Sequence, residues 1–283
     1  MTWYFTEDAA AFRTAAADLL AAEAARNTAV LTLMGSAGRL GWWAEPDGRV
    51  TGVLAVSSPG EPSFGAVTVE AARALVLPEG EEPTAVRGET AAVEAFAEAT
   101  GRPWATAGRM RLFRLGELVP PDPAPVGRAR VATSADIPLT AAWAREFALA
   151  IGEDVTDKDF TGPVTERVTE GRLVLWEAPD GHPVSMACVS PTIEGQARVH
   201  LVYTPPAERG RGYAAGATEA VSRAALDGGV AQVLLFANLA NPTSNALYRR
   251  LGYRPVTDHL TVEFRGEPAP APAPAPAPEP VGG

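Results

Sequence analysis

The sequence predicts an α/β (α+β) protein built from two similar halves in tandem, and three observations carry this prediction. First, Pro-Asp-Gly stands between two apolar runs at residues 46–48 and again at residues 179–181, and this tripeptide favours a hairpin turn. Second, an apolar stretch of helical character ends in glycine at residues 95–101 and again at residues 246–252. Third, a proline-rich stretch at residues 121–127 separates the two sets of features.

These features divide the chain into four segments. We assign residues 1–120 to the first half, 121–127 to a Pro-rich linker, 128–265 to the second half and 266–283 to a tail of alternating alanine and proline. Proline at this density excludes helix and central strand from the linker. An Ala-Pro tract favours extended polyproline II structure and buries nothing, so we expect the tail to be disordered.

The second half contains an ordered series of candidate strands and helices. In the helix that begins at residue 213, small apolar residues recur every three or four positions up to residue 225. This spacing fits one helix face packed on a sheet, and the glycines at 228 and 229 end the helix. The expected strands cover residues 128–132, 173–178, 184–190, 199–203 and 230–237, and the expected helices begin near residues 134, 213 and 242.

A glycine-containing loop, Arg209-Gly210-Arg211-Gly212-Tyr213-Ala214, joins an apolar strand to this helix. Such a loop is an anion site, because its backbone N–H groups converge and the helix dipole adds partial positive charge. The loop also matches the Gly-x-Gly-x-x-Ala form of a dinucleotide-binding fingerprint. That fingerprint requires an acidic residue about 20 positions later, whereas the next strand here ends at Asn238. A structural glycine turn without a ligand is the other alternative.

A second motif follows one strand later, at residues 241–253 (Asn-Pro-Thr-Ser-Asn-Ala-Leu-Tyr-Arg-Arg-Leu-Gly-Tyr). Asn241 can cap a helix, and proline suits the first helical position. Ser244 and Tyr248 are four positions apart and share a helix face. An ordinary core role is the alternative interpretation of Tyr248. The two motifs, in this order, resemble the pyrophosphate loop (Arg/Gln-x-x-Gly-x-Gly/Ala) and the Asn…Tyr…Gly signature of the GNAT superfamily of acetyl-CoA-dependent N-acyltransferases.

This resemblance implies two GNAT-like domains in tandem, each a mixed, mostly antiparallel, twisted sheet flanked by helices. It implies an N-acetyltransferase that transfers the acetyl group of acetyl-CoA, as cosubstrate, to a primary amine of a small molecule or peptide. The amine would attack the thioester directly in a ternary complex. The alternative is a non-catalytic CoA-binding or scaffolding protein of the same fold.

The resemblance also assigns roles to particular residues. Tyr248 corresponds to the family's general acid, because a phenol is protonated at neutral pH and can donate a proton to the leaving thiolate. The expected acetyl-CoA contacts lie on the strand before the loop, in the loop and in the second motif: Leu201, Val202, Tyr203, Arg209, Gly210, Arg211, Gly212, Tyr213, Ala214, Asn241 and Ser244.

The general base is less clear from the sequence. Many GNAT enzymes carry a glutamate on the strand before the loop, and the nearest match here is Arg198. His200 lies two positions further on, with its side chain on the same face of the strand, and its titration range suits a base. A histidine that only fills the sheet surface is the alternative. Glu146, Glu177 and a chain of water molecules are further candidates.

The first half lacks the residues that carry this chemistry. Residues 69–80, where its pyrophosphate loop is expected, contain no Arg-x-x-Gly-x-Gly sequence, and Ala97 stands at the position that corresponds to Tyr248. Without loop glycines the backbone cannot approach a pyrophosphate closely. We therefore expect a degenerate first half that packs against the second or shapes the substrate site, and one acetyl-CoA per chain.

Composition narrows the remaining classes of function. The net charge of −10 and the pI of about 4.9 argue against nucleic-acid binding. No run of about 18 apolar residues predicts a membrane span, and the N-terminus does not resemble a signal peptide, so we expect a cytoplasmic enzyme. The three histidines are too scattered for a metal site, and Cys188 in an apolar run is expected to be buried. A monomer and a homodimer both remain open.

Overall fold

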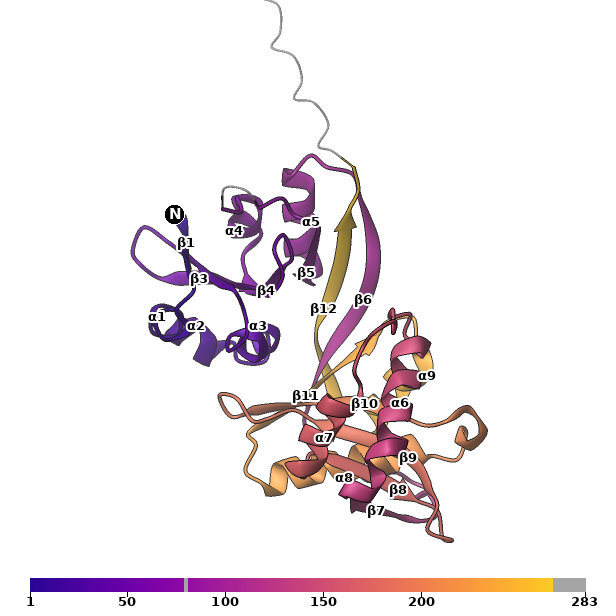
Figure 1. Ribbon diagram of the computed structural model, residues 1–283. Helices are drawn as coiled ribbons and strands as arrows, with labels where there is room; N and C mark the ends of the chain where they lie inside the picture. The colour runs from indigo at the N-terminus through magenta and orange to yellow at the C-terminus, as the bar shows by residue number, and fades with distance from the viewer. Residues whose placement is uncertain (79–80, 267–283) are drawn as a thin grey trace, which may run out of the picture.

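The computed structural model describes residues 1–78 and 81–266, and their strands form one twelve-stranded sheet with helices on both faces (Figure 1). The expected Ala/Pro tail falls outside the described residues apart from Gly266. The first half contains β1 (Thr2–Thr6), α1 (Ala9–Ala15), α2 (Ala17–Ala22), α3 (Thr28–Leu33), β2 (Arg39–Ala44), β3 (Val50–Val56), β4 (Pro62–Val67), α4 (Val69–Arg73), β5 (Ala85–Glu89), α5 (Thr90–Ala99) and β6 (Trp104–Leu115).

The second half repeats this order of strands, with two α-helices where the first half has three after its first strand. It contains β7 (Arg128–Val131), α6 (Ile137–Ala150), α7 (Thr161–Thr169), β8 (Leu173–Glu177), β9 (Pro183–Val189), β10 (Gln196–Tyr203), α8 (Tyr213–Asp227), β11 (Gln232–Asn238), α9 (Pro242–Arg250) and β12 (Tyr253–Phe264). The sequence missed α7, whose first turn holds the poor helix formers glycine and proline. The carboxylate of Asp159 stabilises that turn by accepting the N–H groups of Thr161 and Gly162.

The strand order confirms the predicted fold class and shows the duplication directly. The sheet runs β1-β2-β3-β4-β5-β12-β6-β11-β10-β9-β8-β7, so the two halves repeat the same order outward from the central β12–β6 pair. In each half four antiparallel strands are followed by a parallel neighbour, β5 beside β4 and β11 beside β10. The sheet is therefore mixed and mostly antiparallel, as the family resemblance implies.

The last strand of each half lies in the part of the sheet that belongs to the other half. β6 pairs with β11 from Met110 to Arg114, and β12 pairs with β5 from His259 to Glu263. β6 and β12 pair with each other over their whole length, and Figure 1 shows them as two long strands that connect the two lobes. The division of the chain into two domains at residues 120 and 128 stays a prediction from the sequence. The sheet itself is continuous across that boundary.

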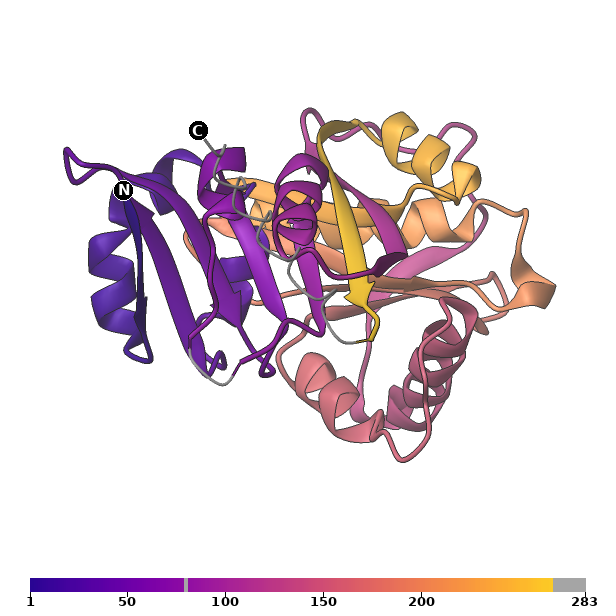
Figure 2. The same cartoon turned by 90° about the horizontal axis from the view of Figure 1, so that it is seen from above.

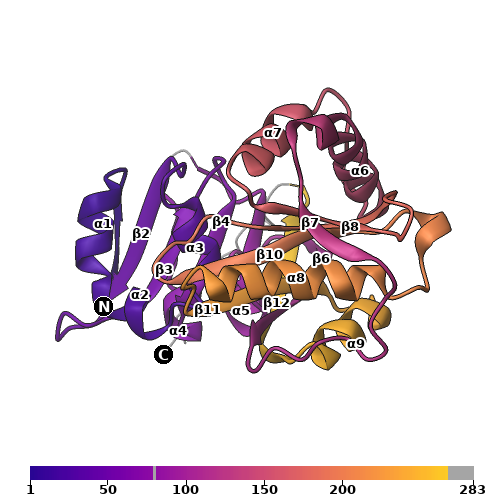
Figure 3. The same ribbon diagram turned by 90° about the horizontal axis from the view of Figure 1, so that it is seen from below.

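Helices cover the two faces of the sheet in the same way in both halves. Figures 2 and 3 show the two lobes side by side, with α6 and α7 on one face of the second half and α8 and α9 on the other. Separate hydrophobic clusters lie under α1–α3, under α4 and α5, under α6 and α7, and under α8 and α9. We call the face under α6 and α7 the α7 face and the opposite one the α8 face.

The two predicted Pro-Asp-Gly hairpin turns are confirmed, and they have the same geometry. Gly48 and Gly181 have φ angles of 85° and 84°, which favour glycine. The carboxylates of Asp47 and Asp180 each accept the backbone N–H two residues later, at 3.0 Å in both turns. The same local sequence therefore folds in the same way at equivalent places in the two halves.

Candidate functional site

The predicted anion loop is a glycine turn at the N-terminus of a long helix. Gly210 and Gly212 both have φ angles of 80°, a conformation that strains any residue with a side chain. Gly212 is the N-cap of the fifteen-residue helix α8, and no side chain caps that end. The first N–H groups of α8 are thus free of a side-chain cap and point out of the helix N-terminus, as an anion site requires.

The arginines of the loop have partners within the protein. The Nε of Arg209 donates to the carbonyl oxygen of Thr204 at 3.0 Å, and Arg211 pairs with Glu208 at 2.9 Å. Both side chains are exposed. Arg209 holds the loop against the end of β10, and an anion at Arg211 would compete with an exposed surface ion pair, which is weak.

The strand before the loop has a β-bulge at the residues expected to hold the thioester arm. β10 pairs with β11 only as far as Val199 and Leu235, and its pairing with β9 is irregular between His200 and Tyr203. Leu201 has a φ angle of 51°, and among the described strands neither Leu201 nor Val202 has a ladder partner. This stretch therefore presents backbone groups that an extended ligand could pair with, as an added strand does.

Tyr248 lies on the buried side of α9 and packs against the aromatic rings of Phe113 and Tyr253, at 6.3 and 6.1 Å between centroids. Burial raises the pKa of Tyr248 to about 12, so its hydroxyl is protonated throughout the neutral range. The hydroxyl of Tyr253 is engaged with Ser222 at 2.7 Å. No such partner is present for the Tyr248 hydroxyl among residues 1–78 and 81–266.

The second motif builds the turn from β11 into α9. The side chain of Asn241 caps the helix by accepting the N–H of Ser244 at 3.0 Å, as predicted for a helix start. Asn245, which the sequence reasoning did not single out, donates to the carbonyl oxygens of Asn238 and Asn241 at 2.8 and 2.7 Å. Asn241 is exposed and Ser244 is half-buried. Asn245 is buried, and because a helix-start pattern does not reveal burial, the sequence carried no signal for its role.

His200 lies on the α7 face of β10, since its neighbour Val199 packs in the cluster under α8. Burial, with Arg167, Arg198 and Arg172 adding to it, lowers the pKa of His200 to about 3. The imidazole is therefore neutral at physiological pH. It is free to accept a proton, but it holds that proton weakly.

The two glutamates named as further candidates for the base have different surroundings. Glu146 on α6 is exposed and accepts a hydrogen bond from the hydroxyl of Tyr203 at 2.6 Å. This bond and burial raise the pKa of Tyr203 to about 12, with burial the larger cause. Glu177 is buried in ion pairs with Arg128 and Arg130. Glu146 thus reaches β10 beside the bulge, whereas Glu177 has a structural environment.

Two of the predicted residues, Val202 and Tyr248, pack in the same hydrophobic cluster. Val202 lies at the bulge, Tyr248 lies in α9, and Ala215 in the first turn of α8 belongs to the same cluster.

Cys188 is fully buried, and burial raises its pKa to about 12, which agrees with a structural role. Within the described residues no three His, Cys, Asp or Glu side chains are placed to hold a metal ion. No described helix combines the length and apolarity needed to cross a bilayer.

Known proteins share the fold of this chain. Residues 139–253 match the sequence profile of the acetyltransferase (GNAT) family, and no curated protein sequence matches the chain. A GCN5-related N-acetyltransferase from Sphaerobacter thermophilus has a TM-score of 0.61 at 16% identity, over 92% of this chain and 94% of its own. An acetyltransferase of the GNAT family from Colwellia psychrerythraea has a TM-score of 0.56 at 11% identity, over 94% and 100%. A GCN5-related N-acetyltransferase from Kribbella flavida has a TM-score of 0.52 at 18% identity, over 77% and 88%.

Proposed function

Residues 139–253 belong to the GNAT superfamily of acyltransferases, and from this premise we propose that the chain is an acetyl-CoA-dependent N-acetyltransferase. The acceptor is a primary amine of a small molecule or peptide, which attacks the thioester directly in a ternary complex. One observation carries the proposal. Val202 at the bulge and Ala215 in the first turn of α8 pack against the hydrophobic cluster that contains Tyr248, which supports one site for the cosubstrate and a proton donor.

Acetyl-CoA fits the groups that these elements present. The uncapped N–H groups of Gly212, Tyr213 and Ala214 suit a pyrophosphate, and the unpaired stretch at Leu201 and Val202 suits the amide-containing arm. The cosubstrate supplies an activated thioester. The protein's part is to bind and orient it, and to move protons to and from the reacting groups.

Tyr248 is the proposed acid for the leaving thiolate, because its raised pKa keeps the hydroxyl protonated. His200 is the first candidate for the base, because it lies on β10 directly before the bulge. Its pKa of about 3 weighs against it, and Glu146, which reaches the same strand through Tyr203, is the second candidate. If His200→Gln lowers kcat by about 10²-fold the first assignment stands; full kcat would assign the role to Glu146 or water.

Release of free thiol from acetyl-CoA in the presence of a panel of primary amines is the direct test of the function. Amine-dependent release above the rate of hydrolysis supports transfer. Binding of acetyl-CoA without amine-dependent release would favour the alternative, a CoA-binding or scaffolding protein. The position of Arg198 on β10, where many related enzymes have a glutamate, is the observation that keeps this alternative in the test.

Ala214 is the position at which to test the cosubstrate site. Gly212 is unsuitable, because its φ of 80° strains any residue with a side chain, so that a loss of binding could come from the backbone. Ala214 is half-buried in the first turn of α8, where a carboxylate stabilises the helix but repels phosphates. We expect Ala214→Glu to abolish a single acetyl-CoA site in titration calorimetry and the isosteric Ala214→Gln to weaken it less. Two sites per chain, or equal effects of both variants, would contradict the assignment.

A further inference from the structure

Arg198 is a partly buried arginine that has no acidic partner among residues 1–78 and 81–266. Its guanidinium lies over the ring of Phe236, 5.9 Å from the centroid. Burial alone accounts for the lowered pKa of Arg198, with no carboxylate contributing. Other partly buried arginines are paired through short contacts to carboxylates: Arg26 with Glu89, Arg111 with Asp258, and Arg172 with Glu166.

A second arginine lies in the same surroundings. Arg167 on α7 is half-buried, and within residues 1–78 and 81–266 no carboxylate lies within ion-pair distance of it or of Arg198. Arg198 precedes His200 by two residues on β10 and therefore shares its face of the strand. Arg167 lies on α7, which covers that face. A desolvated guanidinium without an anion is unfavourable. Two partly buried arginines on one face of the sheet, each without a carboxylate partner in the described part of the chain, favour the binding of an anion there.

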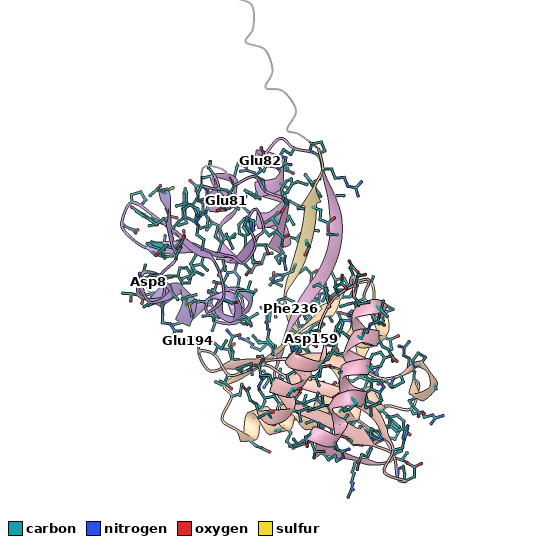
Figure 4. All side chains as sticks on the ribbon, in the orientation of Figure 1. Asp8, Glu81, Glu82, Asp159, Glu194 and Phe236 are labelled. Atoms are coloured by element: carbon teal, nitrogen blue, oxygen red, sulfur yellow. The ribbon has the colours of Figure 1, made fainter. Side chains whose placement is uncertain are left out.

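The aromatic ring beside Arg198 adds an apolar wall to this site. Phe236 is half-buried on β11 and packs edge-on against His259 at 4.9 Å between centroids. Figure 4 shows Phe236 where the second half meets the first. Two residues of the second half contact the first half near this point. Gln196 donates to the carbonyl oxygen of Ala24 at 2.9 Å, and Glu194 pairs with Arg13 at 2.6 Å. The anion site thus lies at the junction of the halves.

The position of Arg198 along β10 sets its distance from Val202, beside which the thioester is proposed to bind. Val202 lies four positions after Arg198, which is about 13 Å of strand at about 3.3 Å per residue. A flexible arginine can shorten that span by several ångströms. An anion bound by Arg198 is therefore separated from the thioester carbonyl by a chain of several bonds rather than by a single carbon.

We propose that the acceptor is an amine that carries a carboxylate, and that Arg198, with Arg167, binds this carboxylate while Phe236 packs against the carbon chain between carboxylate and amine. This inference rests on the proposed acetyl transfer and specifies its acceptor. Amino acids with a remote amine and short peptides have this chemistry. Amines without an anionic group leave both arginines unpaired in the complex and are poorer acceptors.

Matched acceptors test the proposal with the full chain. Glycine, 4-aminobutyrate and 6-aminohexanoate are each compared with the amine that lacks only the carboxylate: methylamine, propylamine and pentylamine. Wild type is expected to favour the carboxylated partner in kcat/KM, most for the two longer pairs. Arg198→Gln should reduce that preference about 10- to 100-fold through KM, the effect of one charge-assisted hydrogen bond. Arg198→Lys should restore part of the preference, because it keeps the charge.

Arg145→Gln is the matched control, since it removes the same charge from an exposed position on α6; it should leave the preference unchanged. Equal use of 6-aminohexanoate and pentylamine by wild type would overturn the proposal, as would an unchanged preference in Arg198→Gln. 3-Aminopropylphosphonate, the phosphonate counterpart of 4-aminobutyrate, distinguishes the anion. A preference of more than tenfold for the phosphonate would overturn the assignment of a carboxylate.

A binding measurement separates this proposal from the proposed transfer. Calorimetry with 6-acetamidohexanoate and the CoA-loaded protein needs no reaction. Binding by wild type that weakens about 10-fold or more in Arg198→Gln supports the carboxylate site even if no thiol is released from acetyl-CoA. If wild type binds 6-acetamidohexanoate no better than Arg198→Gln does, the carboxylate site is wrong, whatever the outcome of the thiol assay.

Discussion

The two halves have a bulge at the same place in the sheet, and only one bulge is open. In β10 the irregular residues are Leu201 and Val202; in β4 the pairing with β3 is irregular between Phe64 and Val67. There the fully buried side chain of Asn27, at the start of α3, accepts the N–H of Ala66 at 2.8 Å. Among the described residues no side chain does this for Val202. In the first half, a side chain of the protein therefore accepts the backbone N–H group at the bulge, whereas in the second half the corresponding N–H group of Val202 has no side-chain acceptor in the part of the chain that the structure describes.

The elements after the two bulges differ in the same sense. In the first half α4 has five residues, and the hydroxyl of Thr68 caps it by accepting the N–H of Ala71. In the second half α8 has fifteen residues and begins at Gly212 without a side-chain cap. Ala97 is fully buried at the position that corresponds to Tyr248. The comparison teaches that the strand framework can be kept while the backbone donors proposed to bind a ligand are satisfied by internal hydrogen bonds and the phenol is replaced by a methyl group.

The largest expected effect comes from removing the first half. β6, from the first half, lies between β11 and β12, and its residues Leu112 and Phe113 are fully buried. A fragment of residues 128–265 therefore lacks an internal strand of its own sheet, and we expect it to lose its folded circular dichroism spectrum. Residues 104–265, which restore β6, should recover part of that signal. Cooperative unfolding of the shorter fragment would show that the two halves are less interdependent than the sheet indicates.

Tyr248→Phe tests whether the chemistry resides in the second half. The variant removes one hydroxyl from a buried ring and keeps the aromatic packing. We expect kcat to fall by about 10²–10⁴-fold, the usual effect of a general acid, with little change in acetyl-CoA affinity. Tyr253→Phe is the control, because its hydroxyl is engaged with Ser222 rather than available to a ligand. Full kcat in Tyr248→Phe, with chemistry rate-limiting, would remove Tyr248 from the mechanism.

Acid should lower the free energy of unfolding of the chain through two histidines that are largely buried. Burial lowers the pKa of His200 to about 3 and of His259 to about 4. The unfolded chain binds protons at these sites below about pH 6.5 and the folded chain does not, so stability falls as the pH drops from about 6.5 to about 4. Each histidine contributes about 1.4 kcal/mol per pH unit in this window. Chemical denaturation at several pH values measures the slope, and His259→Gln should lower it by about half.

The smallest effect is expected at the closed bulge. Asn27→Ala leaves the buried N–H of Ala66 without an acceptor, which costs about 1–3 kcal/mol. Urea unfolding of the full chain gives this difference, and the exposed Asn241→Ala, which removes a helix cap, should cost about 1 kcal/mol. If Asn27→Ala is as stable as wild type, Asn27 does not close the first bulge in solution. If Asn27→Ala binds a second acetyl-CoA, the side chain of Asn27 is the main barrier to binding in the first half.

The sequence alone determined the elements of this protein whose signals are local. Two Pro-Asp-Gly turns, the helix of residues 213–227 and the Asn241 cap appear as predicted, because turn and cap preferences depend on neighbouring residues. The order of the two motifs likewise identified the superfamily of the second half. These features supply the pyrophosphate loop and Tyr248, which is most of the proposed cosubstrate site.

The tertiary structure alone decided how the halves combine and which residues surround the proposed acceptor site. The exchange of β6 and β12 joins segments about 140 residues apart, and strand pairing at that range depends on global packing rather than on local preference. The same holds for Asn27 on Ala66 and for Arg198 on Phe236, contacts that exist only once separate strands and helices are in place. The lowered pKa of His200 follows from burial and from three arginines spread over α7, β8 and β10 or their flanks, because desolvation and field are properties of the folded chain.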